Sequence, residues 1–166
     1  LYLGGRHPLC ESIVDDYGPS FKEMIRHVVR DHNVRDCFFI GGIQDEDNSR
    51  FRLQCWQEVM KEFGLPCSEE YYAYGNYLDT IALQILHSLL EKRQRPPRAV
   101  FCANDSMAVA VCDELKKHGY RVPEDVIVTG FDGTPTADLL QPQLTACGSN
   151  PEDLARLVME RILSFD

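Results

Sequence analysis

The sequence lacks long apolar runs and any excess of positive charge. None of its apolar segments approaches the roughly 20 residues that span a bilayer, and no N-terminal signal peptide is visible. Its 17 basic residues stand against 26 acidic ones, which gives a net charge of −9. Because phosphate binding needs a basic surface, we expect no direct nucleic-acid contact by this segment. The lack of a long apolar run and of a visible signal peptide leads us to expect no membrane contact and a cytoplasmic location. The chain begins at Leu1 rather than Met, which is typical of a segment of a longer protein.

Motifs for catalysis, metals and cofactors are also missing. The seven cysteines form no Cys-x-x-Cys pair, and their odd number favours reduced, buried thiols. Gly41-Gly42 lacks both the dinucleotide-binding glycine spacing and the Walker lysine, and Ser106 lacks a nucleophile elbow. The five histidines form no H-x-x-x-H pair, and the acidic loop 45–48 lacks the glycine and closing glutamate of a calcium loop. We therefore expect no cofactor, no metal and no catalytic residue.

Short strands alternate with longer amphipathic helices. The apolar runs 37–40, 99–102 and 126–129 do not alternate with polar residues, which indicates strands buried on both faces. Further strands are expected at 1–3, 12–14 and 71–74, and helices at 21–32, 49–63, 77–92, 105–118 and from Asn150-Pro151 to about 163. This order predicts an α/β fold with a parallel sheet sandwiched between helices, a Rossmann-like three-layer arrangement.

Polar and aromatic residues follow the predicted strands. In parallel sheets ligands bind at the carboxyl ends of the strands. The segments at those positions are Asp15-Asp16, 44–52, 74–77, Asn104-Asp105 and Asp132. Carboxylates accept hydroxyl protons, arginine and asparagine donate hydrogen bonds, and an aromatic face packs on the C–H side of a sugar ring. The inventory therefore favours a small, polyhydroxylated ligand.

Several linked motifs carry a family resemblance. Residues 99–108 read AVFCANDSMA, residues 122–132 read VPEDVIVTGFD, and residues 142–146 read PQLTA. Upstream lie SIVDD at 12–16, FIGG at 39–42 and SRFRLQCW at 49–56. In this order and spacing they resemble the effector-binding domain of the LacI/GalR family of repressors. The resemblance implies a periplasmic-binding-protein-like type I fold, in which two lobes close on a sugar-like effector, usually as a homodimer, without enzymatic activity.

The resemblance also implies ligand-binding roles for five residues. Arg52 matches the family's ligand-binding arginine, and Asn104 and Asp132 match the amide and carboxylate that hold ligand hydroxyls. Tyr77 falls where an aromatic ring packs on the ligand, and Asp15 matches the aspartate at the crossover between lobes. The alternative for each is a residue that only caps or supports the fold. Two departures, Cys55 for glycine and Asp16 for asparagine, leave the ligand's identity open.

The resemblance covers only part of the family's sensor domain. It assigns 15–147 to the C-terminal lobe, and 1–14 and 148–166 to pieces of the N-terminal lobe. An attached output domain, whether a helix-turn-helix, a kinase or a diguanylate cyclase, is missing from this chain. With half of the cleft absent, we expect the isolated chain to bind ligand weakly or not at all. Two other hypotheses are a Rossmann-like enzyme that uses Asp15, Arg52 and Asp132 on a sugar or nucleotide, and a degenerate interaction module without a ligand.

Overall fold

The chain folds into two compact units. The computed structural model describes residues 1–3, 8–138 and 140–164. Unit 1 comprises Leu1–Tyr17 and Gly148–Asp166, and unit 2 is the continuous segment Gly18–Cys147. The backbone therefore passes between the units twice, after Tyr17 and after Cys147.

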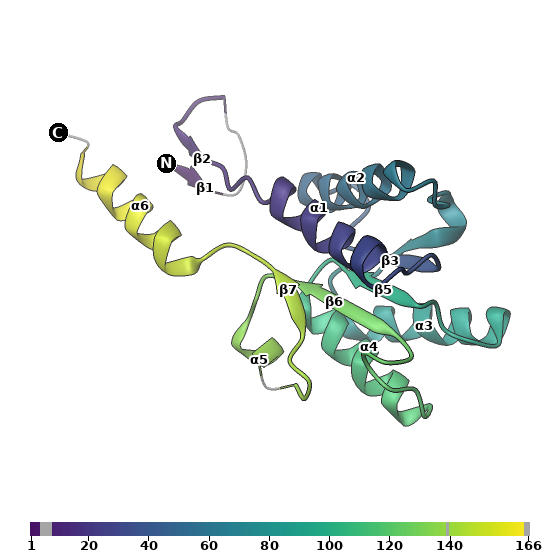
Figure 1. The fold of residues 1–166 in the computed structure, drawn as a ribbon. Helices are drawn as coiled ribbons and strands as arrows, with labels where there is room; N and C mark the ends of the chain where they lie inside the picture. Colours follow the sequence, from purple (N-terminus) through teal and green to yellow (C-terminus); the bar gives the residue numbers. More distant parts are fainter. Residues whose placement is uncertain (4–7, 139, 165–166) are drawn as a thin grey trace. The chain divides into compact units, whose positions relative to one another are not determined.

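Unit 2 is built on a five-stranded parallel sheet (Figure 1). Its strands are β3 (Cys37–Gly41), β4 (Tyr72–Tyr74), β5 (Ala99–Cys102), β6 (Ile127–Phe131) and β7 (Thr145–Cys147). They are ordered β4-β3-β5-β6-β7, and every neighbouring pair is parallel. All residues of β3 and β5 are buried, as their uninterrupted apolar sequences predict.

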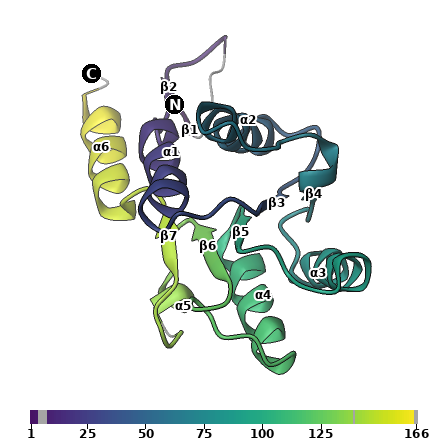
Figure 2. The ribbon, with the colours of Figure 1, turned by 45° about the vertical axis from the view of Figure 1, so that its right-hand side comes forward.

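Helices cover both faces of this sheet (Figure 2). On one face lie α1 (Gly18–Arg26), which continues into a π-helical turn at His27–Asp31, and α2 (Asp47–Glu62). On the other face lie α3 (Asp79–Arg93) and α4 (Asp105–Lys117). Smaller elements are a 3₁₀ turn at Glu69–Tyr71 and α5 (Pro135–Asp138). The predicted three-layer α/β fold is confirmed.

Aromatic side chains fill the layer between the sheet and the α1–α2 pair. Trp56 of α2 is fully buried, and its ring stacks on Phe39 of β3 with centroids 5.8 Å apart. Phe21 of α1 meets Phe131 of β6 edge to face at 5.4 Å. Such aromatic contacts add to the stabilisation from burial itself, so they stabilise the packing of α1 and α2 against the sheet.

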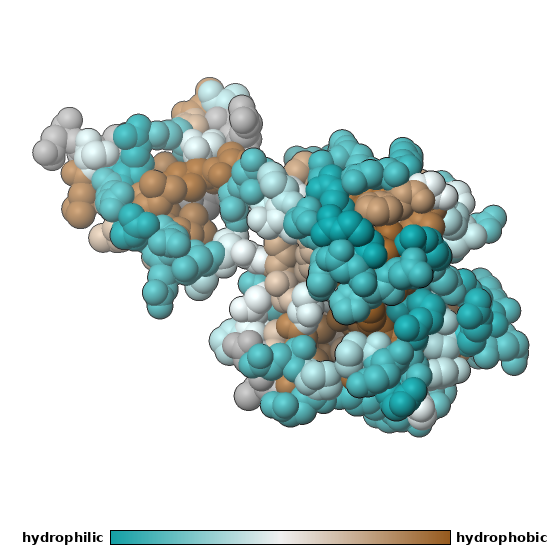
Figure 3. Space-filling view, in the orientation of Figure 1, coloured by the Kyte–Doolittle hydropathy of each residue, from teal (hydrophilic) through white to brown (hydrophobic). Residues whose placement is uncertain are grey.

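Unit 1 is much smaller and more exposed. Strands β1 (Tyr2–Leu3) and β2 (Ser12–Ile13) pair in parallel, and α6 (Pro151–Leu163) is capped by Asn150, whose Oδ1 accepts a hydrogen bond from the Glu152 N–H at 3.0 Å. Arg161 of α6 donates through Nε to Glu11 Oε1 at 2.6 Å. None of the residues of α6 is buried, and apolar side chains are exposed over it in Figure 3. They are Leu157, Met159, Ile162 and Leu163.

Three local predictions were wrong. No strand was expected at 145–147, yet β7 forms the edge of the sheet beside β6. The third strand of the apolar set spans Ile127–Phe131, whereas it was expected at 126–129 with its end at Gly130. Tyr77 was placed at the start of a helix, but its φ of 59° lies in the left-handed region and α3 begins at Asp79. The first difference is a whole edge strand, whose formation depends on pairing with β6. The other two fall at an element's end, where assigned boundaries vary most.

Candidate ligand-binding site

The strand order creates a crevice at the carboxyl edge of the sheet. The chain leaves the interior strand β3 for the edge strand β4 on one side of it, and later returns to β5 on the other side. The connections after β3 and β5 therefore diverge, which is where ligands bind in doubly wound sheets. Backbone hydrogen bonds hold the crevice walls: Ala103 N–H donates to Ile40 O, and Gly75 N–H donates to Gly41 O, each at 2.8 Å.

Arg52 lies at the centre of this edge. It projects from α2, is only 9% exposed, and donates through Nη1 to the carbonyl of Ala103 just after β5. Its guanidinium carbon lies 3.7 Å from the centroid of the Phe131 ring, a cation–π contact, and its Nη2 is 3.8 Å from Asp132 Oδ1. One buried cation thus connects the ends of two neighbouring strands, β5 and β6.

Asp132 follows β6 and presents its carboxylate at the same edge. Its side chain is 47% exposed, and its backbone N–H donates to Cys147 O at 2.8 Å. Its φ of 102° is a conformation that side chains rarely adopt, and such strain concentrates at functional sites. Partial burial raises the pKa of Asp132, Arg52 opposes that rise, and the nearby Asp105 carboxylate adds to it. A ligand that donates a hydrogen bond to the ionised Asp132 carboxylate would therefore stabilise it.

Asn104 has a clear role in the fold as well as a place at the edge. Its Oδ1 accepts from the Met107 N–H at 3.0 Å and caps α4, while its Nδ2 donates to the Tyr77 carbonyl at 3.2 Å. An amide offers two N–H donors and two oxygen lone pairs, so one of each stays available to a ligand. The next residue, Asp105, is 1% exposed and accepts two hydrogen bonds from Thr134, at 2.6 and 2.9 Å.

Tyr77 packs beside the arginine. Its hydroxyl donates to Glu46 Oε2 at 2.5 Å, and its ring centroid is 5.8 Å from the guanidinium carbon of Arg52. The ring occupies the space that a Cβ would need at residue 42, so only glycine fits there. The aromatic ring thus forms one wall next to the buried cation.

Asn104 and Asp132 open onto a cleft of about 580 Å³. Other lining residues include Asp79 of α3, Asp105 and Ser106 of α4, and Thr134, which directly precedes α5. A cleft of similar size, about 610 Å³, lies between β4 and α3, and its lining contains none of the residues predicted to bind ligand. The chemistry of the side chains therefore selects the first cleft over the second.

Four of the five predicted residues meet at this edge. Arg52, Tyr77, Asn104 and Asp132 are connected by the contacts described above. Asp15 belongs to unit 1, where it is exposed and accepts a hydrogen bond from Ser149 Oγ, so its ligand-binding role stays a prediction. The sequence did not reveal the parts played by the Ala103 carbonyl, the Phe131 ring and Glu46. Only the position of Phe131 directly before Asp132 hinted at its contact.

Fold and site together define a lobe of the periplasmic-binding-protein type. The family described as "Periplasmic binding protein-like domain" matches residues 26–165, and the chain belongs to this family. The resemblance to LacI/GalR effector-binding domains is confirmed by relatives and solved structures alike. No helix in the described part of the chain combines the length and the apolarity needed to cross a bilayer.

Individual relatives are transcriptional regulators. The chain is 34% identical over 137 residues to the HTH-type transcriptional repressor PurR of Pectobacterium carotovorum, covering 78% of this chain and 39% of the repressor. It superposes with a TM-score of 0.81 on a transcriptional regulator CelR–cellobiose complex, at 26% identity, covering 98% and 50% of the two chains. The lac repressor dimer bound to operator and an anti-inducer gives 0.82 at 22% identity, covering 92% and 52%. This chain spans less than half the length of the curated relatives it matches.

Proposed function

We propose that this chain senses a small, sugar-like effector as part of a transcriptional regulator, and that it has no catalytic role. The observation that carries the proposal is the placement of Arg52, which is buried and touches Ala103, Phe131 and Asp132 at the carboxyl edge of the sheet. A guanidinium fixed by its surroundings is a pre-organised donor for ligand hydroxyls.

The neighbouring groups complement that donor. Asp132 supplies a half-exposed carboxylate that accepts hydroxyl protons, and Asn104 supplies one remaining donor and one remaining acceptor. Tyr77 supplies an aromatic wall for the C–H face of a sugar ring. The CelR structure, solved with cellobiose, is consistent with this class of ligand.

Sensing requires a second lobe. Only unit 2 carries the ligand edge, whereas the small unit 1 exposes apolar side chains on α6. We propose that unit 1, including 1–14 and 148–166, is part of the N-terminal lobe and that Asp15 lies at the crossover. The closure of both lobes on the effector would shift a two-state equilibrium. The relatives favour a homodimer with a DNA-binding output domain over a kinase or cyclase.

A nuclear magnetic resonance titration tests the proposal on this chain. The ¹⁵N-labelled chain is titrated with cellobiose, glucose, galactose and ribose, up to concentrations that detect millimolar affinity, because half a cleft binds weakly. We expect at least one sugar to shift the amide signals of 103–105 and 131–132 and the Arg52 Nε–H signal. Asp132→Asn should abolish these shifts.

Asp125→Asn is the matched control, since Asp125 is a surface aspartate that pairs with Arg121 and lies outside the edge. It should bind each sugar as the unchanged chain does. The proposal is wrong if no sugar in the panel produces localised shifts, or if Asp132→Asn leaves them unchanged.

A further inference from the structure

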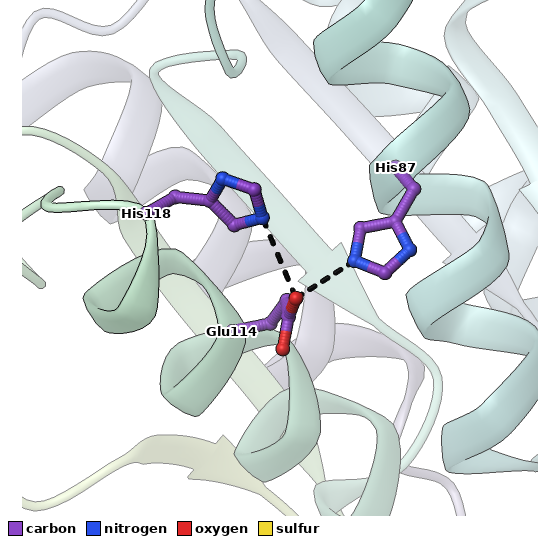
Figure 4. Close-up of side chains that lie close together, drawn as sticks. All are labelled: His87, Glu114 and His118. Atoms are coloured by element: carbon purple, nitrogen blue, oxygen red, sulfur yellow. Dashed lines mark hydrogen bonds and ion pairs between the residues drawn. The ribbon is translucent and has the colours of Figure 1, made fainter.

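A second cluster of ligand-type side chains lies on α3 and α4, away from the strand ends (Figure 4). His87 comes from α3, Glu114 comes from α4, and His118 is the C-cap residue that directly follows α4. One potential metal-ligand atom from each of the three lies within 4.8 Å of the others. Both imidazoles approach one oxygen of the carboxylate: His87 Nε2 is 2.7 Å and His118 Nε2 is 3.4 Å from Glu114 Oε1.

Helix geometry explains the convergence. Glu114 and His118 are four residues apart, so they lie on one helical face, and the His118 N–H donates to the Glu114 carbonyl at 3.1 Å. Helix α3 lies beside α4 on the same face of the sheet and brings His87 across from the opposite side (Figures 2 and 4). The Glu114 side chain is 14% exposed, whereas those of His87 and His118 are 47% and 46% exposed. A fixed carboxylate is therefore flanked by two imidazoles that have room to rotate.

The charge of the cluster suits a cation. Glu114 contributes a carboxylate, which is ionised at neutral pH in an ordinary glutamate, and His87 and Lys117 both contact it. The Lys117 Nζ lies 2.9 Å from Oε2, the other carboxylate oxygen, and its side chain is 70% exposed. Lys117 thus contacts the carboxylate oxygen that the two imidazoles do not, and its exposed side chain can turn toward solvent.

We propose that His87, Glu114 and His118 bind a divalent transition-metal ion, with zinc as the best match. Two imidazole nitrogens and one carboxylate oxygen form a three-ligand set that zinc accepts, and the fourth position is left for water. Ligand atoms of tetrahedral zinc lie about 3.4 Å apart. His87 Nε2 would therefore move slightly away from Glu114 Oε1, from 2.7 Å, whereas His118 Nε2 is already 3.4 Å from it. The ion would link α3 to the C-terminal end of α4, whereas Asn104 caps the N-terminal end.

Zinc titration of the chain tests the site. Calorimetry should give one zinc ion per chain, and thermal unfolding should move to higher temperature with zinc and return with EDTA. Since the loss of a mere supporting contact weakens a metal site about 10- to 100-fold, His87→Ala and His118→Ala should each weaken binding at least about tenfold. Glu114→Gln should also weaken it, and circular dichroism verifies that all three variants stay folded.

Two controls exclude other ligands. The double variant His27→Ala/His32→Ala removes the other close histidine pair, whose Nε2 atoms are 3.2 Å apart, and should bind zinc as the unchanged chain does. Cobalt binding should show no thiolate charge-transfer band, which excludes the accessible Cys10 and Cys67. The proposal is overturned if no zinc binds, if His87→Ala retains full affinity, if the His27/His32 variant loses it, or if the thiolate band appears.

Discussion

Units 1 and 2 contain similar kinds of sequence but bury them to very different degrees. In unit 2 the apolar faces of the helices meet a five-stranded sheet, and Trp56, Phe39 and Phe101 are fully buried. In unit 1 the amphipathic α6 has no buried residue, and Leu163 is 72% exposed. A helix pattern therefore forms wherever caps and periodicity support it, but burial needs partner segments. We therefore expect unit 2 to unfold independently of unit 1.

The largest expected effect comes from comparing a side chain of each unit. Trp56→Ala should lower the free energy of unfolding by about 3–5 kcal/mol, because it empties the space against Phe39. Leu157→Ala, in α6, should change it by no more than about 0.5 kcal/mol, because that side chain is 48% exposed. Urea unfolding followed by far-ultraviolet circular dichroism measures both. A large loss from Leu157→Ala would show that α6 is buried in solution and would remove the contrast between the units.

The two asparagine caps allow a closer comparison. Asn104 caps α4 in unit 2 and Asn150 caps α6 in unit 1. Asn104→Ala should cost about 0.5–2 kcal/mol in the unfolding of unit 2, because an N–H at the start of the helix loses its partner. Asn150→Ala should reduce the helix signal of α6 and leave the unfolding midpoint of unit 2 unchanged. Amide hydrogen exchange resolves the two regions, and coupled changes in both would contradict their independence.

The smallest expected effect concerns two aspartates of unit 2 with opposite pKa shifts. The folded chain raises the pKa of Asp132, mainly by burial, so it holds that proton more tightly than the unfolded chain does. The ionised carboxylate therefore destabilises the fold at neutral pH, and the penalty disappears as the pH falls through the raised pKa. Asp132→Asn should unfold at a slightly higher urea concentration at pH 7, with the difference closing in acid.

Asp125 is the matched opposite. The Arg121 side chain lowers the pKa of Asp125, so its stabilising effect is present at neutral pH and is lost as the pH falls through the lowered value. Asp125→Asn should therefore unfold at a slightly lower urea concentration at pH 7. Urea unfolding curves measured from neutral to acid pH test both variants. If both substitutions shift the urea midpoint in the same direction, the ionised Asp132 carboxylate does not destabilise the fold.

Much of the fold could be predicted from local patterns. The strands at Cys37 and Ala99 were recognised because unbroken apolar runs followed by polar loops are typical of central parallel strands. The edge strand β7 was missed because its three residues, only one of them buried, lack such a run. Its place in the sheet depends on pairing with β6, and a short segment does not encode its partner.

The site was also predicted only in part, because local patterns reveal its residues but not their contacts. Arg52, Asn104 and Asp132 were identified by their positions after strands and by a family resemblance, and their side chains do meet at one edge. The Ala103 carbonyl and the stacking of Arg52 on Phe131 were not foreseen. Every residue has a backbone carbonyl, so only the approach of α2 to the end of β5 selects the one at Ala103. The same holds for His87, which lies 27 residues from Glu114 along the chain.

By itself, the sequence determined the alternation of strands and helices, the caps of α4 and α6, and the polar residues that follow the strands. These are local properties that depend on spacing, apolar periodicity and side-chain hydrogen bonding within a few residues. Only the tertiary structure decided the order of the strands, the contacts of Arg52 and the meeting of α3 with α4 at Glu114. Those depend on packing between segments that are far apart in the chain, where the burial of apolar surface selects the partners.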